Sequence, residues 1–294
     1  MSYRIVKRIF GSNKQETVCD VDISHDILDF CFIPEFGYLF VLRNEHCISH
    51  LDINGNLSIS WLGECGESGR RDGTGRYARM NYPSSICYMP DIKRAYVIEG
   101  GGINLRYIEL DAPYLNSLLG IAVTNSLRKY VSKVSIEDVD TFCCANKYGQ
   151  VFWTSDKLHR CFKYYNGDVK VVVGNGRCGY ASSSNLLYSR LNHPSGVAIV
   201  GNKIYIADKG NHCIREVSKK GLTLFEGCPL DKETMNPSYL KSHKNIFYIL
   251  DGNDVRYFSP SGPSRGIIHS ADNIEGIGLH ERDLLILERV NAKT

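Results

Sequence analysis

The chain has 294 residues, of which 43% are hydrophobic and 23% are charged, and its formal net charge is +3. These values are typical of a globular protein with a real apolar core, and the length fits one large all-β domain or two ordinary domains. No window approaches the ~18 apolar residues of a membrane-spanning helix, which excludes that class. The small net charge neither requires nor excludes a nucleic-acid partner.

The N-terminal stretch "MSYRIVKRIFG" alternates basic and apolar residues. A signal peptide needs a continuous apolar segment after its basic start, and this stretch has none. We therefore expect a chain that stays in the cytoplasm, or in a virus particle assembled there, without membrane insertion.

Eleven cysteines lie mainly in strand-like runs, for example Cys31 in "DFCFIP", Cys87 in "SSICYMP" and Cys213 in "HCIREV". Zinc ribbons and thioredoxin-like proteins use CxxC pairs, and no CxxC pair occurs here. We expect buried thiols that act as small apolar residues, and we expect no cofactor.

Two series of short strands alternate along the chain. The first series ends on a polar residue, and the second consists of short apolar strands that mostly end on glycine. The first series is "LFVLR" (39–43), "AYVIE" (95–99), "VFWTS" (151–155), "IYIAD" (204–208), "FYILD" (247–251) and "LLILE" (284–288). The second series ends at Gly11, Gly63, Gly120, Gly174 and Gly227, and "RGIIHS" (265–270) is a sixth candidate without the glycine.

The fourth copy shows the whole repeating unit. Four short strands, at 195–200, 203–208, 213–218 and 222–227, are joined by "GN", "KGNH" and "KKG". Such tight turns favour antiparallel hairpins, and a four-stranded unit repeated about every 50 residues is typical of a β-propeller blade. The sequence therefore predicts an all-β, six-bladed β-propeller.

We expect a single domain over residues 1–294, with the N-terminal strand (4–11) pairing with the C-terminal blade and closing the ring, which removes exposed edges. That last blade lacks a recognisable third strand and has three or four strands. The expected blades are residues 12–63, 64–120, 121–174, 175–227, 228–270, and 271–294 together with 1–11.

Residues 190–215, "RLNHPSGVAIVGNKIYIADKGNHCIR", and residues 66–86, "GESGRRDGTGRYARMNYPSSI", resemble NHL repeats. The resemblance is specific in these two blades, and strand periodicity alone carries it in the others. It implies a six-bladed ring with a central channel that acts as a binding platform for protein or RNA.

The stretches "ARMNYP" (78–83) and "SRLNHP" (189–194) are one blade-to-blade junction written twice. Pro83 and Pro194 stand just before strands, where the ladder needs no donor. Asp208 and Asp251, like Glu99 and Glu288, end strands of the first series, where a carboxylate can accept N–H bonds from the following turn. We expect these residues to be structural, with Arg79 and Arg190 folding back onto blade carbonyls or a carboxylate.

The loops before these junctions carry arginines with interleaved tyrosines, which are typical interface anchors. We expect one loop face to bind a partner, with Arg128, Lys129, Tyr130 and Lys133 of segment 121–139 adding to it. The candidate residues are Arg70, Arg71, Arg76, Arg79, Tyr82, Arg177, Tyr180, Tyr188 and Arg190.

The leading hypothesis is a non-enzymatic scaffold that binds a protein partner or forms a symmetric assembly, in its most specific version a structural component of a virus or bacteriophage particle. RNA binding by the arginines and tyrosines is an alternative. A second alternative is a hydrolase or lyase with a metal in the central channel.

We expect no catalytic residues and no metal ligands. The expected inner strands are poor in Asp and Glu, and the nine histidines are scattered. No GxSxG nucleophile motif occurs, and "GECGESGRRDGTG" (63–75) matches neither the phosphate loop nor the dinucleotide fingerprint.

Overall fold

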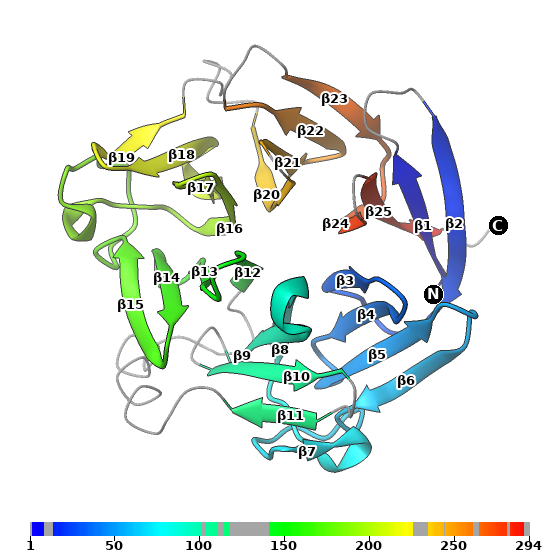
Figure 1. The fold of residues 1–294 in the computed structure, drawn as a ribbon. Helices are drawn as coiled ribbons and strands as arrows, with labels where there is room; N and C mark the ends of the chain where they lie inside the picture. Colours follow the sequence, from blue (N-terminus) through cyan, green and yellow to red (C-terminus); the bar gives the residue numbers. More distant parts are fainter. Residues whose placement is uncertain are drawn as a thin grey trace. The chain divides into compact units, whose positions relative to one another are not determined.

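The structure is a computed structural model that describes residues 2–8, 14–100, 104–110, 114–117, 141–225, 235–243, 245–260, 265–280 and 283–290. Over these residues the regular structure consists of antiparallel β-sheets and short 3₁₀ turns (Figure 1). The sheets are the six blades of a β-propeller, as the sequence predicts. No helix of the described part of the chain is long and apolar enough to cross a membrane.

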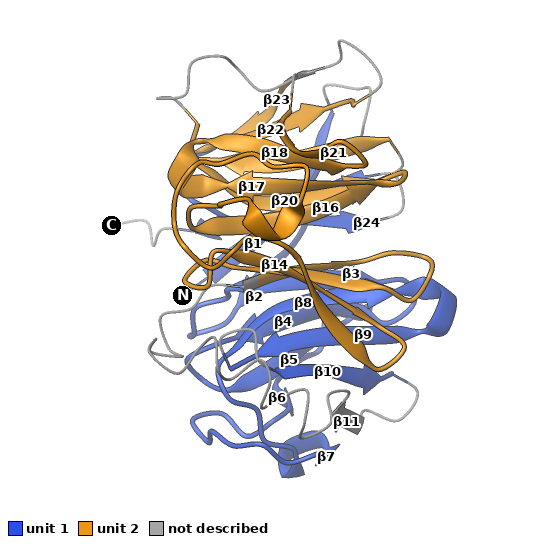
Figure 2. Cartoon of the chain, turned by 90° about the vertical axis from the view of Figure 1, so that its left-hand side faces the viewer, with its two compact units in different colours: residues 1–100, 104–118, 271–294 blue, residues 101–103, 119–270 orange. Residues whose placement is uncertain are grey.

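The chain divides into two compact units, which Figure 2 distinguishes by colour. Unit 1 contains residues 1–100, 104–118 and 271–294, and unit 2 contains residues 101–103 and 119–270. Each unit holds three of the described sheets.

In unit 1 the first blade follows chain order, the second blade is widened by a short strand from the preceding loop, and the last blade combines both ends of the chain. The first blade is β3 (Asp29–Ile33), β4 (Gly37–Leu42), β5 (Cys47–Asp52) and β6 (Leu57–Leu62). The second is β8 (Pro83–Met89), β9 (Arg94–Glu99), β10 (Asn104–Glu109), β11 (Tyr114–Ser117) and β7 (Gly73–Thr74). The last is β24 (Ile274–His280), β25 (Asp283–Val290), β1 (Ser2–Arg8) and β2 (Gln15–Asp22).

In unit 2 all three blades follow chain order, so that each hairpin connects neighbouring strands. The first of them is β12 (Thr141–Ala145), β13 (Val151–Ser155), β14 (Arg160–Tyr165) and β15 (Asp168–Val173). The next is β16 (Pro194–Val200), β17 (Lys203–Asp208), β18 (Cys213–Ser218) and β19 (Gly221–Leu224). The third is β20 (Pro237–His243), β21 (Ile246–Asp251), β22 (Asp254–Phe258) and β23 (Arg265–Ser270).

The N-terminal strand pairs with the C-terminal blade, as expected. β1 runs antiparallel to β25, with Ser2 opposite Val290 and Arg8 opposite Leu284. The strand is the third of its sheet rather than the outermost, because β2 pairs with its other edge. The last blade therefore has four strands, and residues 15–22 belong to it and not to the first blade, whose expected boundary lay at residue 12.

Apolar side chains from successive strands pack between neighbouring blades within each unit. In unit 1, Tyr3 and Ile5 of β1 lie in one cluster with Phe30 and Phe40 of the first blade. In unit 2, Tyr205 of β17 stacks on Phe247 of β21 with ring centroids 4.8 Å apart. Fully buried aromatic rings of this size are large contributors to blade-to-blade packing.

Most of the described cysteines are buried or half-buried, the majority of them in these strands, and Cys178 is exposed. Cys47, Cys161 and Cys213 belong to the apolar clusters. The expectation of buried thiols used as small apolar residues therefore holds for these positions.

Candidate functional site

Two loops join an outermost strand to the innermost strand of the next blade and contain the expected binding residues. We name residues 63–82, in unit 1, the first junction loop and residues 174–193, in unit 2, the second junction loop.

The two junction loops have the same backbone fold. In the first, Gly63 donates its N–H to the carbonyl of Gly75 at 3.0 Å; in the second, Gly174 donates to Leu186 at 3.1 Å. Arg79 pairs through its backbone with Arg71, and Arg190 pairs in the same way with Ala181. Each loop therefore folds back on itself as a closed structure and not as an open tether.

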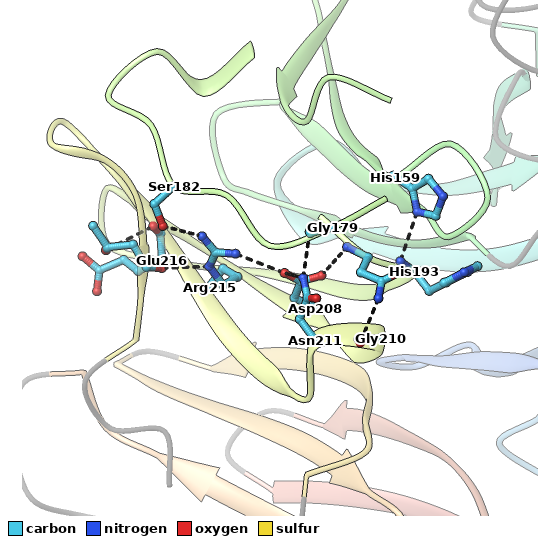
Figure 3. A network of polar contacts seen from close by, with 11 residues as sticks. His159, Gly179, Ser182, His193, Asp208, Gly210, Asn211, Arg215 and Glu216 are labelled. Atoms are coloured by element: carbon cyan, nitrogen blue, oxygen red, sulfur yellow. Dashed lines mark hydrogen bonds and ion pairs between the residues drawn. The ribbon is translucent and has the colours of Figure 1, made fainter. Parts of the chain in front are cut away.

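Asp208, at the end of β17, fastens the second junction loop to the blade (Figure 3). Its carboxylate accepts the backbone N–H of Asn192 at 2.7 Å and the side-chain amide of Asn211 at 2.7 Å. Arg215 of β18 lies 3.3 Å from the same carboxylate, and both side chains of this ion pair are fully buried. The N–H comes from the preceding junction loop, whereas the sequence analysis expected the following turn as the source.

Arg215 extends this network to the outer part of the loop. Its guanidinium donates to the Ser182 hydroxyl at 2.8 Å (Figure 3). It also lies over the Tyr180 ring, 4.3 Å from the ring centroid. Burial raises the pKa of Asp208 to about 6, while the Asn192 N–H, Asn211 and Arg215 oppose the rise. The network therefore connects β17, β18 and the second junction loop through buried polar contacts.

Glu99 and Arg106 repeat this arrangement in the first junction loop. Glu99 accepts the backbone N–H of Asn81 at 3.1 Å and lies 3.3 Å from Arg106. Arg106 also donates to the carbonyls of Arg79 and Arg71 and to the Asp72 carboxylate at 2.7 Å. Burial raises the pKa of Glu99 to about 7, against the opposing effect of Arg106.

Asp251, at the end of β21 in the fifth blade, shows the same pattern. Its carboxylate accepts the N–H of Asn236 at 2.6 Å and lies 2.7 Å from Arg256 of β22. Pro83, Pro194 and Pro237 each begin the innermost strand of their blade, directly opposite Glu99, Asp208 and Asp251, respectively. Proline fits there because it has no N–H, and the carboxylate instead binds the N–H of the nearby asparagine.

Histidines form a second set of hydrogen bonds between a blade and the junction loop that leads to the next blade. His46 and His159 adopt left-handed backbone conformations before β5 and β14, with φ of 57° and 50°. The Nδ1 of His46 accepts the N–H of Tyr82 at 3.1 Å, and that of His159 accepts the N–H of His193 at 3.2 Å. In both pairs the rings meet edge to face.

The arginines of the first junction loop are partly used within the loop itself. Arg71 donates to the Tyr77 carbonyl at 2.6 Å, and Arg79 donates to the carbonyls of Arg76 and Ala78. Arg76 lies 4.0 Å from Glu64. Arg79 thus contacts carbonyls of its own loop, whereas the sequence analysis expected blade carbonyls or a carboxylate.

Exposure separates the expected binding residues into two groups. Arg79 and Tyr82 are half-buried in the first loop. The exposed group is Arg70, Arg71, Arg76, Arg177, Tyr180, Tyr188 and Arg190. Arg128, Lys129, Tyr130 and Lys133 lie outside the described residues.

The structure adds one residue to the set, Tyr77. It is the last residue of the 3₁₀ turn Gly75–Tyr77 and is 76% exposed. Tyr188 ends the equivalent turn, Leu186–Tyr188, and is 71% exposed. Tyr77 precedes the "ARMNYP" stretch just as Tyr188 precedes "SRLNHP", so aligning the two loops through their shared motif would have identified it.

Among the residues that the structure describes, no group of three or more His, Cys, Asp or Glu side chains is arranged to hold a metal ion. His193 Nδ1 lies 3.8 Å from the Asp156 carboxylate, and this contact joins only one histidine and one carboxylate.

Comparisons with known proteins support the fold and the repeat. The family model of the NHL repeat matches residues 191–216, which include β16, β17 and Arg215. The resemblance of residues 190–215 to an NHL repeat is thereby confirmed, and the chain carries this NHL repeat on a six-bladed β-propeller.

One curated relative is Protein SUPPRESSOR OF QUENCHING 1, chloroplastic, from Arabidopsis thaliana. It is 24% identical to this chain over 201 residues. The match covers 64% of this chain and 19% of that protein, so the chain spans about a fifth of its relative's length.

Solved structures share the fold at low identity. A virginiamycin B lyase from Staphylococcus aureus has a TM-score of 0.58 and 11% identity, covering 97% of this chain and 81% of the lyase. A chain of a nidogen–laminin complex has a TM-score of 0.58 and 10% identity. The match covers 91% of this chain and 93% of that chain. At such identities the likeness shows the fold alone, because one fold serves many functions.

Proposed function

We propose that the chain is a non-enzymatic protein-binding module in which each junction loop contacts a partner within its own unit, with Tyr77 as the main anchor of the first loop and Tyr188 as the main anchor of the second. The observation that carries the proposal is the equivalent placement of these two tyrosines, each held out into solvent at the end of a 3₁₀ turn. A single exposed aromatic residue is ordinary, whereas two equivalent ones on matching loops are a repeated feature.

The rigidity of the loops favours this function. Buried ion pairs, Arg106 with Glu99 and Arg215 with Asp208, lie beneath the loops and bind their backbones or side chains. A loop whose conformation is already fixed loses little conformational entropy on binding, which raises affinity. Tyrosine and arginine are also the residue types that most often dominate interface energetics.

Protein is favoured over RNA as the partner because guanidinium groups of the first junction loop already contact protein oxygens. Arg71 and Arg79 already donate to carbonyls of the loop, and Arg76 lies near Glu64. Phosphate binding needs free cationic groups, and its strength falls with salt concentration. Identification of the partner would show whether the module acts in a cell or in a virus particle.

The test uses the full-length chain with three single variants. Tyr77→Ser and Tyr188→Ser remove the proposed anchors, and Tyr148→Ser is the matched control because Tyr148 is 61% exposed but lies in the β12–β13 turn. Partner proteins are captured from the native source by the wild-type chain, identified and purified. The affinity of each partner is then measured for the wild-type chain and for the three variants. We expect an affinity loss of roughly 10-fold or more for each anchor variant and wild-type affinity for Tyr148→Ser.

Equal affinity for the anchor variants and the wild type would overturn the proposal, as would capture of no protein. Capture of RNA alone, with binding that weakens as salt rises and as Arg177 and Arg190 are changed to Ala, would replace it with the RNA-binding alternative. Turnover of a substrate that depends on a bound metal would replace it with the enzyme alternative.

A further inference from the structure

Two thiols meet where the first junction loop leaves the first blade. Cys47 is the first residue of β5 and is fully buried, and Cys65 is half-buried in the loop. Their sulfur atoms are 2.6 Å apart, and either thiol can act as the donor to the other. Cys47 belongs to the apolar cluster that contains Tyr3 and Phe40, and Cys65 packs against that cluster.

The surrounding backbone holds the two thiols in this position. Cys65 donates its N–H to the Ser60 hydroxyl at 3.3 Å, and Gly66 donates to the Glu45 carbonyl at 3.0 Å. The loop segment that carries Cys65 is therefore bonded to β6 and to the turn between β4 and β5, and Cys47 is fixed within the sheet.

The second junction loop fastens the same point in a different way. Because His46 and His159 are equivalent, the next residue is Cys47 in one blade and Arg160 in the other. Because Gly63 and Gly174 are equivalent, Gly176 takes the position of Cys65. Arg160 donates to the Asn175 carbonyl at 2.9 Å, and its guanidinium fills the space beside Gly176. The thiol pair thus occupies the place of a structural contact.

We propose that Cys47 and Cys65 are an oxidative modification site, which a peroxide converts to a disulfide and a thiol reductant reopens. The disulfide links the first junction loop covalently to the third strand of the first blade. A disulfide needs its two sulfur atoms side by side, and the sulfur atoms of Cys47 and Cys65 are already in contact.

The reaction begins at Cys65, which is the more accessible thiol. Its sulfur attacks one peroxide oxygen, the O–O bond breaks, and water leaves, giving a sulfenic acid. The Cys47 sulfur then attacks the Cys65 sulfur, the S–OH bond breaks, and the departing hydroxide takes the Cys47 proton as a second water. Each sulfur loses one electron, and the peroxide gains two.

Burial, the hydrogen bond to Cys65, and the nearby Cys65, Glu45 and Glu64 raise the pKa of the Cys47 thiol, with burial as the largest cause. Cys47 therefore stays protonated near neutral pH and does not react first, because the thiolate is the nucleophile. This assigns the initial attack to Cys65 and the resolving step to Cys47.

The first experiment detects the link in the full-length folded chain. The protein is treated with hydrogen peroxide, alkylated in denaturant, and cleaved after glutamate, which separates Cys47 in peptide 46–64 from Cys65 in peptide 65–67. We expect these two peptides to be joined after peroxide and separate after reduction. Cys65→Ser should abolish the link, and Cys178→Ser, which removes a thiol that is exposed, should leave it intact.

The second experiment tests whether the link fastens the loop. Brief trypsin digestion cuts at exposed Arg70 and Arg71, and cleavage needs local opening of the loop. Oxidised wild-type protein should be cut there several-fold more slowly than reduced protein, while the rate for Cys65→Ser should not change with peroxide. Absence of the joined peptides, or their formation with no effect on the cleavage rate, would overturn the proposal.

Discussion

The carboxylate of Asp208 and the guanidinium of Arg215 form a fully buried ion pair, 3.3 Å apart, beneath the second junction loop. Glu99 and Arg106 form the corresponding pair beneath the first loop, but Arg106 keeps a second carboxylate, Asp72, at 2.7 Å. The two pairs therefore differ in what remains when the acidic partner is removed.

Asp208→Asn should destabilise the protein strongly. The change leaves Arg215 buried without a carboxylate, which typically costs about 3–5 kcal/mol in the free energy of unfolding. Glu99→Gln should cost less, because Asp72 still pairs with Arg106. Urea unfolding of both variants checks the order, and an equal or larger loss for Glu99→Gln would contradict the roles assigned here.

Gly174→Ala should destabilise more than Gly149→Ala, although both residues have positive φ, at 104° and 78°. A Cβ on Gly174 would lie 2.3 Å from the His159 carbonyl oxygen, whereas a Cβ on Gly149 would meet nothing within 4 Å. Overpacking of this kind adds about 1–3 kcal/mol to the shared backbone strain. Thermal unfolding of the two variants measures the difference, and equal midpoints would rule out the clash.

The pH dependence of stability should include a contribution from His159. Burial, with nearby His193, Lys157 and Arg160, lowers its pKa from 6.5 to about 4. Because the folded pKa is lowered, the unfolded chain binds the proton first, so this contribution to stability is complete above about pH 6.5 and is lost as the pH falls towards about 4.

His159→Asn is the matched variant, because asparagine tolerates the left-handed backbone and its Oδ1 can accept the His193 N–H without titrating. Urea unfolding at a series of pH values should show a steeper loss for the wild type than for the variant between about pH 6.5 and pH 4. Glu99 and Asp208, whose raised pKa values lower stability as pH rises, are present in both proteins. Their contributions therefore cancel in the difference between the wild type and His159→Asn. Parallel curves would contradict the assignment.

Ile5→Ala should show how much the N-terminal strand contributes to the last blade. Ile5 is fully buried in β1, between β25 and β2, and large-to-small changes at such sites cost about 2–5 kcal/mol. Arg4→Ala is the control on the same strand, because Arg4 pairs with Asp20 at the surface. Equal unfolding midpoints for the two variants would contradict a structural role for the closure.

The sequence by itself determined the blades, because each strand and turn depends on local chemistry. The strands of β17 and β18 show apolar residues in runs, and the turns between them contain Gly and Asn, so both could be read without knowing any neighbour. The pairing of the N-terminal strand with the last blade followed from the strand count and from the cost of a free edge.

Only the tertiary structure revealed β2. Its sequence, "QETVCDVD", is largely exposed and shows little apolar signal, because an outermost strand has a neighbour on one side only. Its hydrogen bonds to β1, rather than side-chain burial, place it in the sheet, and a hydrophobic pattern cannot report backbone pairing. This is why the last blade could not be completed from the sequence.

The candidate loops divide in the same way. The sequence located both loops and most of their exposed arginines and tyrosines through the repeated "N-x-P" junction. The structure alone paired residues far apart in the chain: Asn192 with Asp208, His159 with His193, and Cys47 with Cys65. Those pairings depend on how blades pack and on left-handed backbone turns. Neither can be predicted from the order of residues along one strand.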